Sequence, residues 1–500
     1  MKKCFSAVVF FVLLFLAAAP AMAGAPEGQW AMKGDDAFGS HRNPNAVLRT
    51  GKILWSVDVP RYGVSSLIID KEGTVYVFSD YGIAIKPDGA IKWSTKESED
   101  VFSFDSTGVI ADDGFIYILS QSGELYRFST GDGSYELLAE VDTFGGIFGW
   151  AHFIMDNTAR IFAVSSPFTF GGAVYLHSLL TSGEVRFQKQ VGSASFSDYS
   201  PVMHTSGKLL LYGVGGEEMD TQGVVLAADP ETGAYETIYT PEAKPLLYDA
   251  PSVDPDTGWV FVPGSMQAEG WGFVAALNEN FEVMWERNDF PSRIQAAVGP
   301  ELIYLVGYED EFAALDKLTG EIKWRYEITH GVDSNKASAV VDGCGNAVVV
   351  YGGSDGETFG NVIAVAPDGT ELFRFEKLEG GQPLGTPALA DDGTLYVRAG
   401  GKVYAIGGDP IECDIPIVSD DDDDDNDVVT DDDDTIPDDD DDDVLTDDDD
   451  MTPDDDDDKI TDDDDKSNND DEAESELDSS RSAAEDTESK KEEGCSCRVR

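Results

Sequence analysis

The sequence predicts an all-β protein, an eight-bladed β-propeller that is followed by a disordered acidic tail. A unit of about 46 residues recurs eight times between residues 48 and 408. Seven of the units contain four short β-rich stretches separated by turn residues, the eighth contains three, and one unpaired stretch of this kind precedes the first unit. Four strands per unit at this period are typical of a radial array of small sheets.

The first 23 residues have the layout of a secretory signal. Lys2 and Lys3 precede an apolar run over 7–19, and the small-residue triplet that ends at Ala23 follows. The run is shorter than the ~20 residues that cross a bilayer. We therefore expect a cleaved signal peptide (1–23), an exported chain in the periplasm, at the cell surface or in the medium, and no transmembrane span.

The repeated unit is clearest at residues 312–324, which read FAALDKLTGEIKW. An Asp starts the turn, and a Gly supplies the positive φ that a tight turn requires. A Trp then follows on the next strand, where neighbouring sheets must pack and a large apolar ring is useful. We expect this packing role for four tryptophans: Trp55, Trp93, Trp285 and Trp324.

The ends of the repeat array predict how the propeller closes. The last unit has a third strand at 403–406 but no Trp-bearing strand after it, whereas a Trp-bearing strand at 50–55 precedes the first unit. Pairing these two strands would complete the eighth blade and remove exposed sheet edges. The sequence therefore predicts a propeller over 24–412 that is closed by an N-terminal outer strand.

Two segments carry a resemblance to a known family. The pattern A-x-D-x-x-T-G-x-x-x-W within 313–324 and the leading segment QWAMKGDDAFGSHRN at 29–43 are similar to pyrroloquinoline-quinone (PQQ)-like repeat proteins of the quinoprotein-like superfamily. The resemblance covers roughly 30–408. It implies a β-propeller, and it is weak for function because the family includes both quinoprotein dehydrogenases and non-enzymatic envelope scaffolds.

Catalytic signals are weak in this sequence. The resemblance associates quinoprotein dehydrogenases with adjacent cysteines, a calcium ion and an Asp base, but none of the five cysteines is adjacent to another. The five histidines are scattered without a paired metal spacing. We expect a protein that is not an enzyme and holds no cofactor, and the alternative is a PQQ-dependent dehydrogenase-type enzyme.

A ligand-binding face is predicted where the connections between blades emerge beside the loops that join second to third strands. These loops are rich in aromatic residues, and loops on a rigid scaffold commonly carry function. We expect this face to bind an envelope or surface protein, or a glycan. The candidate residues are Phe104, Phe148, Trp150, Phe170, Tyr199, Tyr248, Trp271 and Phe359.

A disulfide is predicted between Cys344 and Cys413. Cys344 lies in the turn between the first two strands of the seventh unit, and Cys413 follows the third strand of the eighth. Both positions are expected on the propeller face opposite the aromatic loops, in neighbouring blades, and export permits disulfides.

The charge is concentrated in the tail. The chain has a formal net charge of −64, and 41 of its 98 acidic residues lie in 419–500. A chain this acidic lacks the basic surface that nucleic acid requires. We expect residues 413–493 to be disordered, with weak calcium binding by Asp runs at most. These runs include Asp431, Asp438, Asp447, Asp454 and Asp462.

The last seven residues, GCSCRVR at 494–500, resemble the start of a myxobacterial-type C-terminal sorting tag. That resemblance implies anchoring through Cys495 or Cys497. Together the features predict an exported, monomeric, non-catalytic scaffold of the cell envelope or surface. A further alternative is a calcium- or mineral-associated surface protein in which the tail is the active part.

Overall fold

The computed structural model separates the chain into two units, Met1–Ser419 and Asp420–Arg500. It describes residues 25–413 except 61–64, 97–103, 105, 149–152, 167–171, 195–199, 216–221, 266–271, 291, 293, 308–310, 329–337, 353–358 and 382–384. The predicted signal cleavage after Ala23 and the predicted disorder of the tail therefore lie outside the described residues. The same holds for Cys495, Cys497, Asp431, Asp438, Asp447, Asp454 and Asp462.

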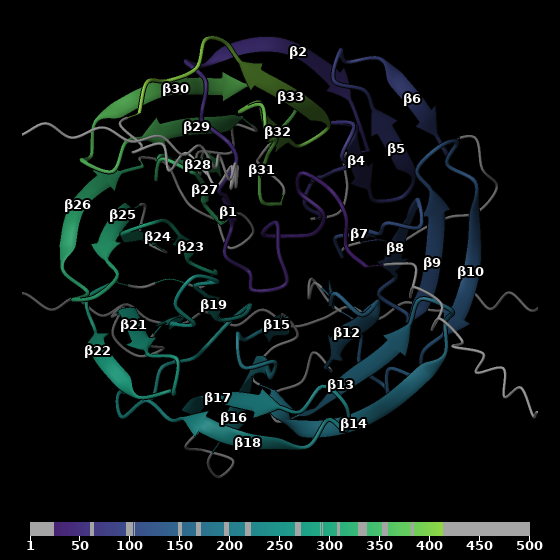
Figure 1. Cartoon of the computed structure of the whole chain (residues 1–500), viewed down its shortest axis with the longest axis vertical. Coiled ribbons are helices and arrows are strands. Elements are labelled where there is room, and N and C mark those ends of the chain that lie inside the picture. Colours follow the sequence, from purple (N-terminus) through teal and green to yellow (C-terminus); the bar gives the residue numbers. More distant parts are fainter. Residues whose placement is uncertain are drawn as a thin grey trace, which may run out of the picture. The chain divides into compact units, whose positions relative to one another are not determined.

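The described residues form strands and no helix, and the strands follow one another in antiparallel groups of four (Figure 1). The first four groups are β3–β6 (Ile68–Ile69, Val75–Phe78, Gly82–Ile85, Ile91–Ser94), β7–β10 (Val109–Ile110, Phe115–Leu119, Glu124–Ser129, Tyr135–Glu140), β11–β14 (Ile154–Met155, Arg160–Ser165, Gly172–Leu180, Val185–Ala194) and β15–β18 (Val202–Met203, Leu209–Gly215, Gln222–Ala228, Tyr235–Tyr239).

The remaining groups continue the same pattern around the unit (Figure 1). They are β19–β22 (Ser252–Val253, Val260–Ser265, Gly272–Leu277, Val283–Arg287), β23–β26 (Ala297–Val298, Leu302–Val306, Glu311–Asp316, Ile322–Glu327), β27–β30 (Val340–Asp342, Ala347–Gly352, Gly360–Val365, Glu371–Leu378) and β31–β33 (Ala388–Leu389, Leu395–Ala399, Lys402–Gly407) with β2 (Lys52–Asp58).

Hydrogen bonding joins the described strands into seven sheets rather than eight. The groups β11–β14 and β15–β18 share one eight-stranded sheet, because Ser193 of β14 pairs with Val214 of β16. The all-β propeller fold is confirmed, whereas the count of eight blades stays a prediction.

The last sheet closes as the sequence predicts. Strand β2 pairs antiparallel with β33, with Val57 opposite Val403 and Ile53 opposite Ile406. The sheet order β2-β33-β32-β31 places this N-terminal strand outermost. The start and the end of the repeat array are therefore held by backbone hydrogen bonds within one sheet.

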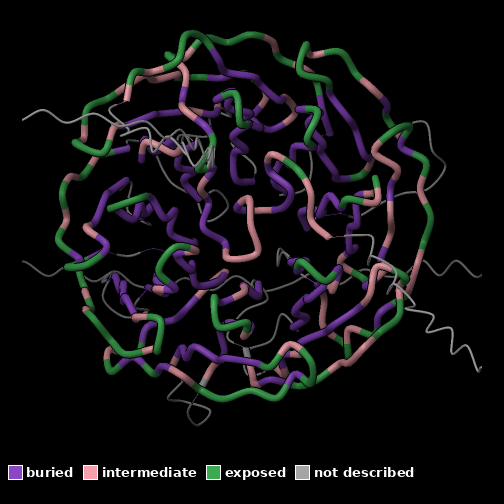
Figure 2. The backbone as a smooth tube through the Cα atoms, in the orientation of Figure 1, coloured by how far each residue is buried: buried purple, intermediate pink, exposed green. Residues whose placement is uncertain are grey.

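Burial decreases from the inner strands to the outer strands of each group (Figure 2). The second and third strands β4 and β5 are buried throughout, while the outer strand β6 has exposed residues at both ends and one buried residue, Trp93. Strands that are covered on both faces are accordingly apolar, and the outer strands have one face in water. The core therefore lies between neighbouring sheets.

Each of the four predicted tryptophans lies on an outer strand and contacts the next group along the chain. The indole N–H of Trp285 donates to the carbonyl of Lys317 at 2.9 Å, and a Cβ on Gly320 would lie 2.6 Å from the same ring. Trp93 repeats this contact with Thr130 at 2.9 Å and with Gly133. The glycine of the turn thus leaves room for the ring, and Trp55 and Trp324 donate to Pro87 and Pro367 in the same way.

Residues 25–49, which we name the strap, cross the centre of the ring of strands (Figure 1). Within it, β1 (Arg42–Asn43) pairs in parallel with β27. The strap forms hydrogen bonds with the innermost strand of seven of the described groups, and the partner residues are Ile69, Ile110, Met203, Val253, Val298, Val341 and Leu389. A segment outside the repeats therefore links the inner strands to one another.

The C-terminal end of the described unit is held beside the turn after β27. Cys344, in the turn after β27, forms a disulfide with Cys413, and their Cα atoms are 6.1 Å apart. The amide of Ile411 donates to the carbonyl of Leu48 at 2.9 Å, so the exit segment also contacts the end of the strap. The structure thus places the predicted cysteine pair in contact where the chain leaves the propeller.

Candidate functional site: the loop face

The connections that follow the fourth strands and those between second and third strands emerge on one face, because the strands of a group are antiparallel. We name this the loop face. Several of its connections lie outside the described residues. Four of the predicted ligand-face residues belong to these connections: Trp150, Phe170, Tyr199 and Trp271.

Two predicted ligand-face residues are buried, and the prediction is wrong for them. Phe104 and Phe148 are each 1 % exposed. Phe104 packs edge-on against Phe128, with ring centroids 5.9 Å apart, and Phe148 packs edge-on against His177 at 4.8 Å. Their rings fill the space beneath the inter-blade connections, where a ligand cannot reach them. Tyr248 and Phe359 are partly exposed.

An aromatic pair on the surface joins Phe144, which lies in the same connection as Phe148, to the partly exposed Tyr175. Phe144 is 46 % exposed, and its ring stacks on Tyr175 with centroids 4.2 Å apart and planes 21° from parallel. Phe144 belongs to the connection between β10 and β11, and Tyr175 lies near the start of β13, so the pair is on the loop face. Sequence reasoning selected Phe148 in its place.

A strained turn holds Phe144 outward. Its φ is +54°, and the following Gly145 has a φ of +78°. The amide of Gly146 donates to the carbonyl of Thr143 at 3.0 Å, and the amide of Phe144 donates to Oδ1 of Asp142 at 2.8 Å. A bulky residue with positive φ costs of order 1–3 kcal/mol and persists only where its surroundings enforce it. The only sequence signal for this exposure is the pair of glycines after Phe144.

A buried Ser165–His177 pair lies beneath the aromatic stack, and its hydrogen bonds do not fit a nucleophile with its base. Nε2 of Gln188 donates both to the carbonyl of Asp142 at 2.8 Å and to Nδ1 of His177 at 3.1 Å. The proton of His177 is therefore on Nε2, which donates to Oγ of Ser165 at 2.7 Å. A ring nitrogen that donates to the hydroxyl cannot also accept its proton.

Acid is expected to destabilise the propeller through His177. Burial lowers the pKa of His177 to about 4, against the weaker opposing effect of Asp142, while the unfolded chain has an ordinary pKa of about 6.5. The neutral, buried His177 therefore contributes about 3 kcal/mol to the free energy of unfolding above pH 6.5, and this contribution is lost as the pH falls toward 4. Urea unfolding at pH 7 and pH 4 should show a smaller difference for His177→Gln than for the unchanged protein, and equal differences would contradict this assignment.

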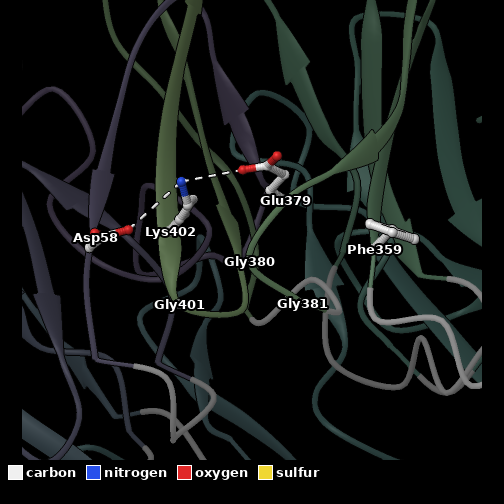
Figure 3. Close-up of a pocket in the computed structure, with 7 residues that line it drawn as sticks. All are labelled: Asp58, Phe359, Glu379, Gly380, Gly381, Gly401 and Lys402. Atoms are coloured by element: carbon white, nitrogen blue, oxygen red, sulfur yellow. Dashed lines mark ion pairs between the residues drawn. The ribbon is translucent and has the colours of Figure 1, made fainter.

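A pocket of about 350 Å³ lies elsewhere on the loop face, where β30 ends and β33 begins (Figure 3). Glycines 380, 381 and 401 form one part of its wall, and Phe359 stands at its side. The charged groups at its mouth are Asp58, Glu379 and Lys402. The ring of Phe359, predicted as a ligand-face residue, therefore does line a pocket.

The charged groups of this pocket form only long, exposed ion pairs with one another. Nζ of Lys402 lies 3.6 Å from Glu379 and 3.8 Å from Asp58, whose side chains are 78 % and 89 % exposed (Figure 3). Lys377 lies 6.0 Å above the Phe359 ring. Exposed ion pairs of this kind contribute at most about 1 kcal/mol and exchange partners readily. The pocket offers both signs of charge beside an aromatic ring.

The described residues contain no group of three or more His, Cys, Asp or Glu side chains arranged to hold a metal ion. In the same part of the chain, no helix is long and apolar enough to cross a membrane.

Comparison with known proteins gives one family match and several structural matches. Residues 44–194 match the family model described as outer membrane protein assembly factor BamB. No curated protein sequence matches the chain. The structure is similar to that of BamB from Moraxella catarrhalis, with 17% identity, a TM-score of 0.53, and coverage of 71% of this chain and 97% of that one.

Two solved enzymes are also similar in structure. Quinohemoprotein alcohol dehydrogenase from Comamonas testosteroni has 12% identity, a TM-score of 0.56 and coverage of 77% of this chain and 81% of that one. A europium-containing methanol dehydrogenase has 14% identity, a TM-score of 0.54 and coverage of 76% and 98%. At these identities the likeness establishes the fold and leaves the activity open.

Proposed function

We propose that this chain, a β-propeller with the fold of the PQQ-repeat proteins, is an exported, non-catalytic scaffold of the cell envelope that binds a protein partner through its loop face. The observation that carries the proposal is the Phe144–Tyr175 stack, in which an exposed ring held by a strained turn lies on a partly exposed ring of a sheet. Aromatic anchors of this kind dominate the energetics of protein interfaces.

Further observations support a scaffold rather than an enzyme. The strap occupies the centre of the ring of strands, which reduces the space along the axis (Figure 2). The Ser165–His177 pair is protonated in the wrong sense for nucleophilic catalysis. The family model that matches residues 44–194 is that of an outer membrane protein assembly factor, which favours a role in the envelope.

Affinity capture from envelope extract tests the proposal, with residues 24–415 as bait. Phe144→Ala and Tyr175→Ala should each reduce the amount of captured partner at least about tenfold, as expected for interface anchors worth 1.4 kcal/mol or more. Leu318→Ala is the matched control, because Leu318 is 69 % exposed and lies in a third-to-fourth-strand turn on the opposite face. Capture that is unchanged in all three variants would overturn the proposed role of the pair.

The second candidate function is a quinone-dependent dehydrogenase, which the two structurally similar enzymes favour. It predicts dye reduction that depends on added quinone, together with a bound chromophore. Neither should be observed if the scaffold proposal holds. Weak calcium binding by the Asp-rich tail is a separate proposal, and calcium uptake that survives removal of the propeller would support it.

A further inference from the structure

A cavity of about 320 Å³ lies between the strap and the first-to-second-strand turns that follow β11 and β15. These turns emerge on the face opposite the loop face, so the cavity is independent of the proposed binding site. The strap wall is fixed in place, since Met203 donates its amide proton to the carbonyl of Ala37 at 2.7 Å and Ile110 donates to Ala31 at 2.9 Å. The cavity is therefore bounded by hydrogen-bonded backbone on its strap side.

The wall of the cavity is largely apolar and includes three methionines. Met32 and Met155 are almost completely buried, and Met203 and Phe38 are partly buried beside them. Methionine side chains are flexible and polarisable, and they adapt to unbranched hydrocarbon chains. This part of the cavity is suited to an alkyl chain.

The acidic groups of the cavity differ in whether they have partners. Asp36 accepts hydrogen bonds from the amides of Phe38 and Ser40 and from the Ser40 hydroxyl. Asp156 is paired with Arg160. The carboxylate of Asp35 has no hydrogen bond or ion pair within the described part of the chain, although it lines the cavity. Among the three acidic side chains that line the cavity, Asp35 is therefore the one without a partner in the described part of the chain.

The charges that surround Asp35 do not neutralise it. Asp36 and Asp391 are its nearest charged neighbours, and with burial they raise its pKa well above the usual range. Lys33, the basic residue nearest in sequence, is committed to Asp249 at 2.8 Å. Both nitrogens of His204 are occupied, by Ser206 and by the carbonyl of Gly258. A cation that entered the cavity would therefore meet a carboxyl group that has no counter-charge, and it would stabilise the ionised form of that group.

We propose that this cavity binds a primary alkylammonium ion, whose nitrogen pairs with the Asp35 carboxylate and whose chain lies along Met32 and Met155. A hard divalent cation fits less well, because calcium requires six to eight oxygen ligands and, among the described residues, Asp35 supplies the single carboxylate of the cavity that is without a partner. A partly buried carboxyl group next to an apolar wall matches both parts of an alkylamine.

Calorimetric titration of the full chain with n-pentylammonium chloride tests this inference, with 1-pentanol as the uncharged probe of the same length. Saturable binding of the amine and at least about tenfold weaker binding of the alcohol are expected. Asp35→Asn should weaken amine binding at least about tenfold. Asp132→Asn, an exposed acid in the turn between β9 and β10, should leave it unchanged.

Two results of the titration would contradict the proposed alkylammonium site. Equal affinity for amine and alcohol, or equal affinity of the Asp35→Asn and unchanged proteins for the amine, would overturn the inference. Met155→Gln provides a second variant, in which the carboxylate is kept and the apolar wall is interrupted. Shortening the probe to methylammonium should then weaken binding in the unchanged protein more than in Met155→Gln, and the reverse order would also count against the site.

Discussion

Replacing Trp30 by alanine is expected to lower the free energy of unfolding by about 3–5 kcal/mol, the range for an aromatic side chain removed from a core. Trp30 is fully buried in the strap and belongs to a core cluster that includes residues of β3 and β31. Its backbone also exchanges hydrogen bonds with Ile69 at 3.2 and 2.9 Å. The alanine variant would leave a cavity where the strap meets the inner strands.

Trp30→Phe is the matched control for this prediction. The indole N–H of Trp30 has no partner in the described part of the chain, so phenylalanine removes a buried donor that gains nothing. We expect a loss of about 1 kcal/mol, since only part of the ring volume is removed. Urea unfolding followed by fluorescence of the remaining tryptophans gives both values. Similar losses for the two variants would show that ring volume at this position matters less than burial indicates.

The repeat signal predicts the parts of the fold that depend on local patterns. The Asp, Gly and Trp of 312–324 each act within their own turn or against the next turn, and Gly320 and Trp285 show the contact that this pattern requires. Closure by β2 follows because the last repeat lacks an outer strand. The turn and packing residues recur from repeat to repeat. A single sequence therefore shows the same local pattern several times, which makes it recognisable.

The strap is not predictable in the same way. It occurs once, and its contacts are mostly backbone hydrogen bonds to residues between about 40 and 360 positions away, such as Ile69 and Val341. Backbone groups have no residue-specific signature. Its central position is set by tertiary structure, and the sequence reveals only that the segment resembles one found before related repeats.

The binding face is predictable as a face but not residue by residue. Phe144 and Phe148 lie in one connection and have the same chemistry, yet one is exposed and the other is buried against His177. The difference arises from the left-handed φ of Phe144 and Gly145 and from the side chains beneath them. Composition locates aromatic loops, whereas the orientation of each ring depends on packing.

Removing one partner of the Lys317–Asp254 ion pair is expected to be as damaging as Trp30→Ala. Nζ of Lys317 lies 2.8 Å from Oδ2 of Asp254, and their side chains are only 10% and 1% exposed. Lys317→Met would leave the carboxylate of Asp254 buried without its counter-charge, which costs about 3–5 kcal/mol. Lys71→Met is the control, because the Lys71–Glu27 pair is exposed and should contribute less than about 1 kcal/mol.

The double variant Lys317→Met/Asp254→Asn separates the cost of an unpaired charge from that of lost packing. Asparagine keeps Oδ1 to accept from the amide of Asp256, and its Nδ2 can donate to the Thr257 hydroxyl that donates to Oδ2 of Asp254 in the unchanged protein. We therefore expect the double variant to recover most of the stability lost in Lys317→Met, as measured by urea unfolding at pH 7. If the two losses simply add, the aliphatic chain of Lys317 and its contacts between neighbouring blades, rather than the charge pair, hold these turns together.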